Sequence, residues 1–255
     1  MISDKNIDRG KSFDWGLTSA DYAKYRDIYP EELYNRLREL GVAADGTSWL
    51  DLGTGTGILP QNLYNSKANI TGVDIANEQV ETAKEIAENN GWHINYFTSP
   101  AESTGLPDNN FDCITAAQCF WYFDRDKMKA EISRMLKPGG KLIKIFMDWC
   151  LDDEIVAKSI NLVKKYNAQW DPTSYGEKDI YDDLFDGRIT EEYYCDIPFT
   201  RESWHGRMCA CRGTLASMSE EQFAEWSAEH RSMLAGYPGE FIVKHKLYIT
   251  YFKLK

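Results

Sequence analysis

The feature that most constrains this chain is a glycine-rich stretch at residues 51–57, Asp-Leu-Gly-Thr-Gly-Thr-Gly. An apolar segment at residues 48–51 precedes it and predicts a short buried strand, and the pattern from Ile58 predicts the start of a helix. Glycines at such a junction let the backbone turn tightly and approach a ligand closely. The stretch therefore predicts a ligand-binding loop at the carboxyl end of a strand.

Strand and helix patterns alternate over residues 46–147. Further strands are predicted at residues 70–74, 94–97, 111–117 and 142–147. A helix with Asn77 as its N-cap follows the second strand, and another, capped by Asp124, follows the fourth. Repeated strand and helix units with turn residues at each junction predict an α/β fold with a doubly wound, mostly parallel sheet.

The segments on either side follow other patterns. In residues 1–45, Leu33, Leu37 and Leu40 form a helical stripe. After residue 147, helices are predicted at 155–166, 203–217 and 219–235, and strands at 192–199 and 244–254. We therefore expect a single domain, with an N-terminal helical lid (1–45), a ligand-binding core (46–147), and a C-terminal cap with the last two strands (148–255).

Asp74 ends the second predicted strand, where a carboxylate can accept hydrogen bonds from both hydroxyls of a ribose, so we expect an adenosine-containing ligand. A dinucleotide fits the loop poorly, because Ile58 stands where a small residue is required and Asp51 would repel a pyrophosphate. S-adenosylmethionine carries a sulfonium and an ammonium group, which an acidic pocket stabilises. It is the predicted cofactor, and a nicotinamide-dependent oxidoreductase is the less favoured alternative.

Charge and apolar patterning bear on partners and location. Twenty-nine Lys and Arg against forty Asp and Glu give a net charge of −11, so no positive field attracts nucleic acid. No run of eighteen apolar residues and no signal-peptide pattern occur, so we expect a cytoplasmic protein without a membrane partner. His205, Cys209 and Cys211 do not complete a tetrahedral ligand set, and no metal is expected.

Four segments together resemble the Rossmann-type (class I) S-adenosylmethionine-dependent methyltransferases, in the small-molecule branch that includes trans-aconitate methyltransferase-like enzymes. They are WLDLGTGTG at 49–57, TGVDIA at 71–76, PAESTGLPDNNFDCITAAQCFWYFD at 100–124 and LKPGGKLI at 136–143. The resemblance implies a seven-stranded sheet with an antiparallel last strand and in-line methyl transfer to a small molecule.

The resemblance also implies a cofactor site. The positions along the methionine and ribose are Gly53, Gly55 and Gly57, with Asp51 near the amino group, Asp74 at the ribose and Ile75 beside the adenine. The further positions are Ala101 and Glu102 at the base, and Ala117 and Gln118 at the methionine portion. Tyr22 and Arg26 lie in a stretch that the branch uses as a lid, and would reach the methionine carboxylate; Asp27 replaces the usual proline there.

The acceptor side carries weaker patterns. Trp121 stands where many relatives have a histidine, so no general base is expected there and no catalytic residue is assigned. Alignment of the reactants in a dry pocket can supply most of the acceleration. The acceptor residues predicted are Trp121, Tyr122, Trp149 and Arg207, and Arg207 with Arg212 suits a carboxylate-bearing acceptor. A non-catalytic cofactor-binding module is the other alternative, and the acceptor and the oligomeric state stay open.

Overall fold

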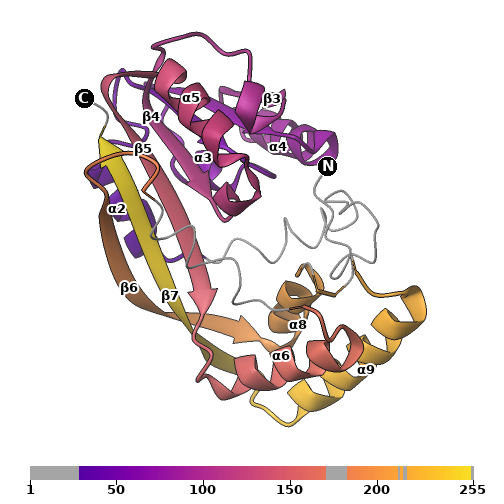
Figure 1. The fold of residues 1–255 in the computed structure, drawn as a ribbon. Helices are drawn as coiled ribbons and strands as arrows, with labels where there is room; N and C mark the ends of the chain where they lie inside the picture. Colours follow the sequence, from indigo (N-terminus) through magenta and orange to yellow (C-terminus); the bar gives the residue numbers. More distant parts are fainter. Residues whose placement is uncertain (1–28, 171–182, 212, 215–216, 254–255) are drawn as a thin grey trace. The chain divides into compact units, whose positions relative to one another are not determined.

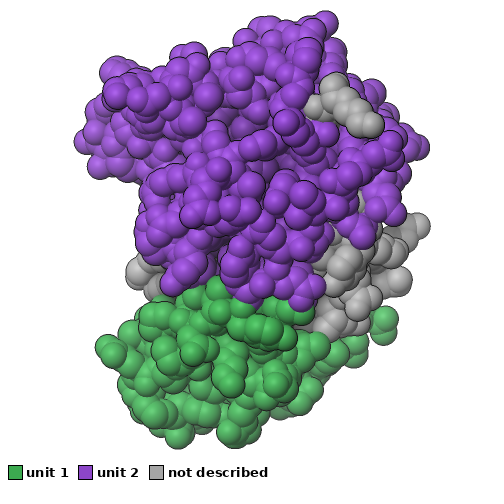
Figure 2. Space-filling view, turned by 90° about the vertical axis from the view of Figure 1, so that its left-hand side faces the viewer, with its two compact units in different colours: residues 1–28, 148–174, 194–246 green, residues 29–147, 175–193, 247–255 purple. Residues whose placement is uncertain are grey.

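The computed structural model describes residues 29–170, 183–211, 213–214 and 217–253. The chain divides into two compact units, coloured separately in Figure 2. Unit 2 contains the described residues 29–147, 183–193 and 247–253. Unit 1 contains the described residues 148–170, 194–211, 213–214 and 217–246. Tyr22, Arg26 and Arg212 lie outside the described residues, and the division into lid, core and cap stays a prediction.

A seven-stranded sheet with the order β3-β2-β1-β4-β5-β7-β6 organises the fold (Figure 1). Its strands are β1 (Ser48–Leu52), β2 (Asn69–Asp74), β3 (Ile94–Thr98), β4 (Phe111–Ala117), β5 (Leu136–Trp149), β6 (Ile189–Thr200) and β7 (Glu240–Lys253). Strand β1 pairs in parallel with β2 and β4, β2 with β3, and β4 with β5. In Figure 1 the arrow of β7 points opposite to that of β5. The predicted α/β fold with a mostly parallel seven-stranded sheet is confirmed.

Helices follow the strands near the predicted places, but Asn77 is the first residue of its helix and Ala76, not Asn77, is the N-cap. The helices are α2 (Glu31–Glu39), α3 (Ile58–Asn62), α4 (Asn77–Asn89), α5 (Arg125–Met135), α6 (Glu154–Tyr166), α8 (Arg201–Cys209) and α9 (Glu220–Ala235). Short 3-10 turns form η2 (Ala101–Ser103) and η3 (Phe120–Tyr122). Asp124 caps α5 by accepting a hydrogen bond from the Lys127 N–H, as its sequence position predicts.

Three elements differ in length from the sequence expectation. The strand expected at 142–147 begins at Leu136, because Leu136 already pairs with Phe111 of β4 before a bulge in the register. The helix expected to reach residue 217 ends at Cys209, where the Thr214 hydroxyl lies 2.8 Å from the Cys209 carbonyl and competes with continuation of the helix. The helix expected to start at Ile58 extends only to Asn62.

The core of unit 2 lies between the sheet and its helices. One buried cluster packs α5 against the central strands, and its members include Leu50, Leu52, Ile114, Met128, Ile132, Met135 and Leu142. A second cluster joins α4 to β3 through Val80, Ala83, Ala87 and Tyr96. Full burial of each large apolar side chain contributes about 1.5–3 kcal/mol, so the strands that carry the glycine-rich loop are firmly held.

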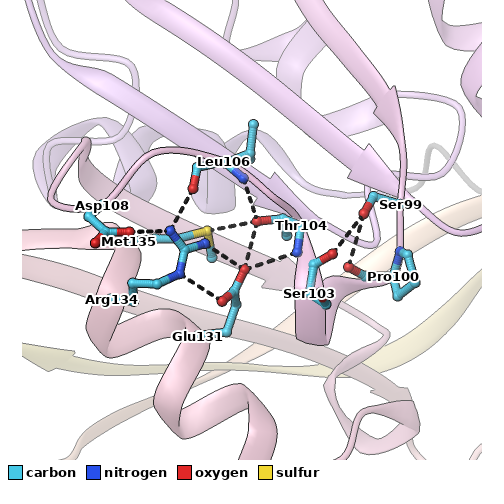
Figure 3. A network of polar contacts seen from close by, with 9 residues as sticks. All are labelled: Ser99, Pro100, Ser103, Thr104, Leu106, Asp108, Glu131, Arg134 and Met135. Carbon is cyan, nitrogen blue, oxygen red and sulfur yellow. Dashed lines mark hydrogen bonds and ion pairs between the residues drawn. The ribbon is translucent and has the colours of Figure 1, made fainter.

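A polar network fixes the outer side of α5 to the segment after β3 (Figure 3). The Glu131 carboxylate accepts hydrogen bonds from the Thr104 N–H at 2.9 Å and from Arg134 at 2.7 Å. Arg134 also donates to the Leu106 carbonyl at 2.6 Å. The Arg134 guanidinium lowers the pKa of Glu131 to about 2, so this network stays charged at neutral pH.

Unit 1 contains a buried chain of hydrogen bonds among α6, α8 and α9. The Trp204 indole N–H donates to Ser159 Oγ at 3.0 Å, and Ser159 lies 3.1 Å from His230 Nε2. The Nδ1 atoms of His230 and His205 are 2.8 Å apart, and His205 Nε2 lies 3.1 Å from Ser227 Oγ. Because an indole N–H only donates, one direction satisfies every member with both histidines neutral. Burial agrees, since it lowers the pKa of His205 to about 4 and of His230 to about 3.

Candidate functional site

The loop after β1 requires glycine for backbone and packing reasons. Gly53, Gly55 and Gly57 have left-handed φ angles of +63°, +57° and +83°. A Cβ at Gly57 would also collide with the Tyr96 hydroxyl, and one at Gly53 would lie 2.6 Å from Cys119 Sγ. The loop is therefore packed closely on the side chains behind it.

Asp74 closes this loop onto the end of β2. Its Oδ2 accepts a hydrogen bond from the Gly55 N–H at 2.8 Å, and its Oδ1 accepts one from the Ala76 N–H at 2.9 Å. Burial raises the pKa of Asp74, while these backbone donors lower it. A carboxylate has about four lone-pair sites, so Asp74 keeps acceptor capacity for two hydroxyl groups.

Asp51, the last polar residue before the loop, is 3% exposed. Its Oδ1 lies 2.6 Å from the Thr115 hydroxyl, which in turn accepts a hydrogen bond from the Trp49 indole N–H at 2.8 Å. Burial raises the pKa of Asp51 to about 7, the Thr115 hydrogen bond lowers it, and the nearby charge of Asp74 raises it. A buried carboxylate with such a pKa is a frequent mark of a functional position.

The strand ends beside the loop carry the other predicted cofactor positions. Ile75 follows β2 with 60% of its surface exposed, which suits contact with a flat apolar group. Ala101 is buried in η2. The neighbouring Glu102 carboxylate accepts a hydrogen bond from the Asp124 N–H at 3.0 Å and thereby joins η2 to the start of α5.

Gln118, directly after Ala117 at the end of β4, adopts a left-handed φ of +57°, which is uncommon for a residue with a side chain. Its N–H donates to the Ile145 carbonyl at 2.9 Å and its side-chain amide donates to the Met147 carbonyl at 2.5 Å. Backbone conformations of this kind persist where the surroundings fix them, and they cluster at functional sites. The end of β4 is thus held in a defined, strained conformation.

The predicted acceptor residues fall in different units. Trp121 and Tyr122 belong to η3 in unit 2, and the ring of Trp121 lies 5.2 Å from Tyr122 and 5.3 Å from Phe146. Trp149 and Arg207 belong to unit 1, where the Arg207 guanidinium lies 5.1 Å over the Trp149 ring. All described cofactor positions lie in unit 2.

The sequence reasoning missed four polar residues around the loop. Trp49 donates to Thr115, which in turn bonds to Asp51, and the buried Thr54 Oγ1 and Tyr96 hydroxyl have no hydrogen-bond partner among the described residues. Buried polar atoms of this kind are rare and indicate a place for a polar ligand or water. Thr115 reaches Asp51 because the two residues pair across β1 and β4, a register that the sequence alone specifies weakly. The glycine cradle, Asp74 and these atoms fit a polar nucleoside ligand.

The described part of the chain shows neither a metal-binding cluster nor a membrane-spanning helix. Those residues hold no group of three or more His, Cys, Asp or Glu side chains that could bind a metal ion. None of the described helices combines the length and the apolar character needed to cross a membrane.

Comparisons with known proteins agree with this geometry. Residues 50–144 match a family model described as a methyltransferase domain. The chain is 35% identical over 107 residues to the ubiquinone/menaquinone biosynthesis C-methyltransferase of Vibrio cholerae, covering 40% of this chain and 41% of that protein. It is 29% identical over 147 residues to the ubiquinone biosynthesis O-methyltransferase of Coxiella burnetii, covering 55% of this chain and 63% of that protein.

A solved structure shares the fold over most of the chain. The structure of a proposed type II methyltransferase from Anaeromyxobacter dehalogenans superposes with a TM-score of 0.62 and 22% identity, covering 89% of this chain and 96% of that one. The chain thus spans about two fifths to three fifths of the two curated relatives, while the fold likeness extends well beyond the matched domain.

Proposed function

We propose, from the match of residues 50–144 to a methyltransferase-domain model, that the protein is an enzyme that transfers the methyl group of S-adenosylmethionine to a small molecule. The observation that carries the proposal is the hydrogen bond from the Gly55 N–H to Asp74, which joins the glycine loop to a carboxylate at the end of β2. This arrangement places a close-approach backbone beside an acceptor for ribose hydroxyls.

S-adenosylmethionine is the cofactor of this domain, and four kinds of contact would hold it. The Asp74 carboxylate accepts the ribose hydroxyls with its remaining lone pairs. Gly53, Gly55 and Gly57 let the methionine and ribose portions lie against the backbone. Asp51 supplies negative charge for the ammonium group, and exposed Ile75 covers one face of the adenine.

The chain's contribution to the reaction is to bind, orient and desolvate. When bound, the cofactor would supply a methyl group on a positively charged sulfur, and the carbon of that methyl group would be attacked in line by a nucleophilic atom of the acceptor. Holding two reactants in such geometry can account for about 7–11 kcal/mol of a barrier. Because the leaving thioether is neutral, a strong base is dispensable, in agreement with the expectation that no general base stands at Trp121.

The acceptor class is the finer part of the proposal. The two curated relatives are named as a C- and an O-methyltransferase of quinone biosynthesis, which supports a small-molecule acceptor and leaves the acceptor atom to product analysis. An anionic group on the acceptor is supported by Arg207, a 6% exposed guanidinium over Trp149. Asp148 shares this environment, and burial raises the pKa of its carboxyl to about 6 while Arg207 lowers it.

One experiment tests the proposed activity. The protein is incubated with S-adenosylmethionine labelled in the methyl group and with a fractionated metabolite extract, and labelled products are identified by mass spectrometry. We expect a labelled small molecule together with S-adenosylhomocysteine, and neither with the Asp74→Ala variant. Binding of S-adenosylhomocysteine without any product would favour the non-catalytic module, and binding of a nicotinamide nucleotide instead would favour the oxidoreductase.

A second experiment tests the anionic acceptor once a product is known. Arg207→Lys should raise the KM for the acceptor at least about tenfold with little change in S-adenosylhomocysteine affinity, because a lysine loses the bidentate geometry of the guanidinium. Arg201→Lys is the matched control, since Arg201 lies in the same helix and is exposed. Equal KM values in wild type and Arg207→Lys would remove the anionic acceptor and leave the methyltransferase proposal intact.

A further inference from the structure

A directed chain of hydrogen bonds ends at Asp51. The Trp49 indole N–H only donates, so the Thr115 hydroxyl must accept from it at 2.8 Å. The single proton of that hydroxyl then has two acceptors in reach, Asp51 Oδ1 at 2.6 Å and the Leu50 carbonyl at 3.5 Å. The shorter bond is the stronger one, and it requires the Asp51 oxygen to act as an acceptor.

The sheet register explains why these side chains meet. Asp51 pairs with Thr115 across β1 and β4, and Trp49 precedes Asp51 by two residues. Side chains two residues apart in a strand lie on the same face, so all three share one face of the sheet. They are all buried, and the glycine loop starts two residues after Asp51. The hydrogen-bond chain from Trp49 through Thr115 thus holds the Asp51 carboxyl from within the sheet.

We propose that Thr115, oriented by Trp49, is a positioning residue that keeps the Asp51 carboxyl ionised for the ammonium group of the cofactor. This inference rests on the proposed function and deepens it. A hydrogen bond donated to a carboxylate favours its ionised form. An Asp51 carboxyl protonated on Oδ2 would still accept from Thr115 through Oδ1, but as a weaker acceptor than a carboxylate, so the hydrogen bond from Thr115 favours the ionised form.

The surroundings make Asp51 sensitive to pH near neutrality. Burial and, to a smaller extent, the charge of Asp74 on β2 raise the pKa of Asp51 to about 7 against the lowering effect of the Thr115 hydrogen bond. Burial also raises the pKa of Asp74 and of Tyr96 on β3, and it raises the pKa of Cys113 on β4 to about 12. Tyr96 and Cys113 are therefore neutral at pH 7. A ligand ammonium favours the ionised Asp51, so affinity should increase with pH.

Calorimetric titration with S-adenosylhomocysteine from pH 5.5 to 8.5 tests the proposal. Wild-type affinity should rise about tenfold per pH unit below the pKa of Asp51 and level off above it. In Thr115→Val the levelling-off should move up by about one pH unit, giving affinity about fivefold weaker at pH 7 and nearly equal at pH 8.5. Trp49→Phe should shift it in the same direction by less, because the Thr115 hydroxyl remains but is no longer oriented.

Three controls separate a charge effect from a packing effect. Thr115→Ser keeps the hydroxyl and should keep the wild-type pH profile. Thr71→Val removes a buried threonine hydroxyl on neighbouring β2 that is not part of the hydrogen-bond chain from Trp49 to Asp51. It should leave the midpoint of the pH dependence of affinity unchanged. With 5′-methylthioadenosine, which has no ammonium group, the shift between wild type and Thr115→Val should disappear, whereas any titration of Asp74 at the ribose would persist.

The outcomes distinguish this inference from the function on which it rests. An affinity loss in Thr115→Val that is the same at every pH, or an unchanged midpoint, would overturn the positioning role while leaving the methyltransferase proposal standing. Failure of the wild type to bind S-adenosylhomocysteine at any pH would overturn both. If Thr115→Val does not fold, Trp49→Phe and Thr115→Ser carry the same comparison.

Discussion

The two units each contain a buried hydrogen-bond chain that starts at an indole, and the chains end differently. In unit 2, Trp49 and Thr115 lead to Asp51, a carboxylate next to the glycine loop. In unit 1, the chain from Trp204 passes through Ser159 and two histidines and ends at the neutral hydroxyl of Ser227. One chain therefore supports a charge beside a candidate binding site, while the other satisfies its own members.

The difference teaches how to separate functional from structural polar groups. Burial of polar side chains does not separate the units, because both contain it. The distinguishing features of unit 2 are the left-handed glycines of the loop, the left-handed Gln118, and a buried carboxyl with a pKa near 7. Buried polar atoms without a partner among the described residues do not separate the units, because Trp226 Nε1 and His245 Nε2 of unit 1 are of this kind, as are Thr54 and Tyr96 of unit 2. Backbone strain beside a buried carboxyl of raised pKa indicates a ligand. The following variants test this assignment, from the largest expected effect to the smallest.

Asp74→Ala should have the largest effect, and it should be an effect on binding. Losing two charge-assisted hydrogen bonds to ribose hydroxyls, together with the anchor of Gly55, should weaken S-adenosylhomocysteine binding by about 2–4 kcal/mol. Calorimetry at pH 8 measures it. Asp45→Ala is the control, because Asp45 contacts Lys67 and Asn65 at the exposed surface. An unchanged dissociation constant in Asp74→Ala would contradict the assignment of unit 2 as the binding unit.

Gly57→Ala should lower both stability and affinity. The new Cβ collides with the Tyr96 hydroxyl, and the alanine must keep the φ of +83° that glycine has here. We therefore expect a loss of about 2–3 kcal/mol in unfolding free energy. Gly41→Ala has a similar φ of +91° with open space around it, and should cost only about 1 kcal/mol. Denaturant unfolding compares the two. If both cost the same, backbone strain alone explains Gly57, and adding Tyr96→Phe should give no rescue.

His230→Leu should affect stability and leave binding intact. Ser159 and His205 each lose a buried partner, which should cost about 2 kcal/mol of unfolding free energy. S-adenosylhomocysteine affinity should change less than about threefold, because the described cofactor positions lie in unit 2. The exposed His93 provides the control His93→Leu. A large loss of affinity in His230→Leu would show that the two units are energetically coupled.

The same variant should change the acid sensitivity. Burial lowers the pKa of His205 to about 4 and of His230 to about 3, whereas histidines in the unfolded chain titrate near 6.5. The unfolded state therefore binds more protons below pH 6.5, and stability falls as the pH decreases from 6.5 toward 4. His230→Leu should flatten this decrease, although His245, whose pKa burial lowers to about 4, preserves part of it.

The sequence predicted the strands and the loop well because their causes are local. Glycines at 53, 55 and 57 and the alternating or continuous apolar runs specify turns and strands without reference to distant residues. Long-range effects were invisible. Sequence spacing suggested that the helix from residue 203 continues to 217, but Thr214 hydroxyl contacts accompany its end at Cys209.

The polar surroundings of the site were harder to predict than its ligand-facing residues. Asp51 and Asp74 stand next to glycines or strand ends, which marks them in the sequence. Thr115 and Tyr96 look like ordinary strand residues, and only pairing of β1 with β4 and packing behind Gly57 bring them to the loop. The supporting residues of a site depend on register, which a single sequence specifies weakly.

Glu131→Gln should have the smallest effect. It tests whether a paired polar network affects cofactor binding merely because it lies in unit 2. Its network in Figure 3 is fully paired and lies on α5, so it should resemble the histidine chain of unit 1 in affecting stability alone. Because Arg134 is partly exposed, we expect about 1 kcal/mol at pH 7. The pKa of Glu131 is lowered to about 2, so this contribution is present above about pH 4.5 and is lost as the pH falls toward 2.

Unfolding titrations at pH 7 and pH 3 should therefore show the stabilities of wild type and Glu131→Gln converging in acid. The control Glu81→Gln, in an exposed pair with Lys84, should differ little from wild type at either pH. A change in S-adenosylhomocysteine affinity in Glu131→Gln would mean that this fully paired network also acts on binding, and that pairing alone does not mark a polar group as structural.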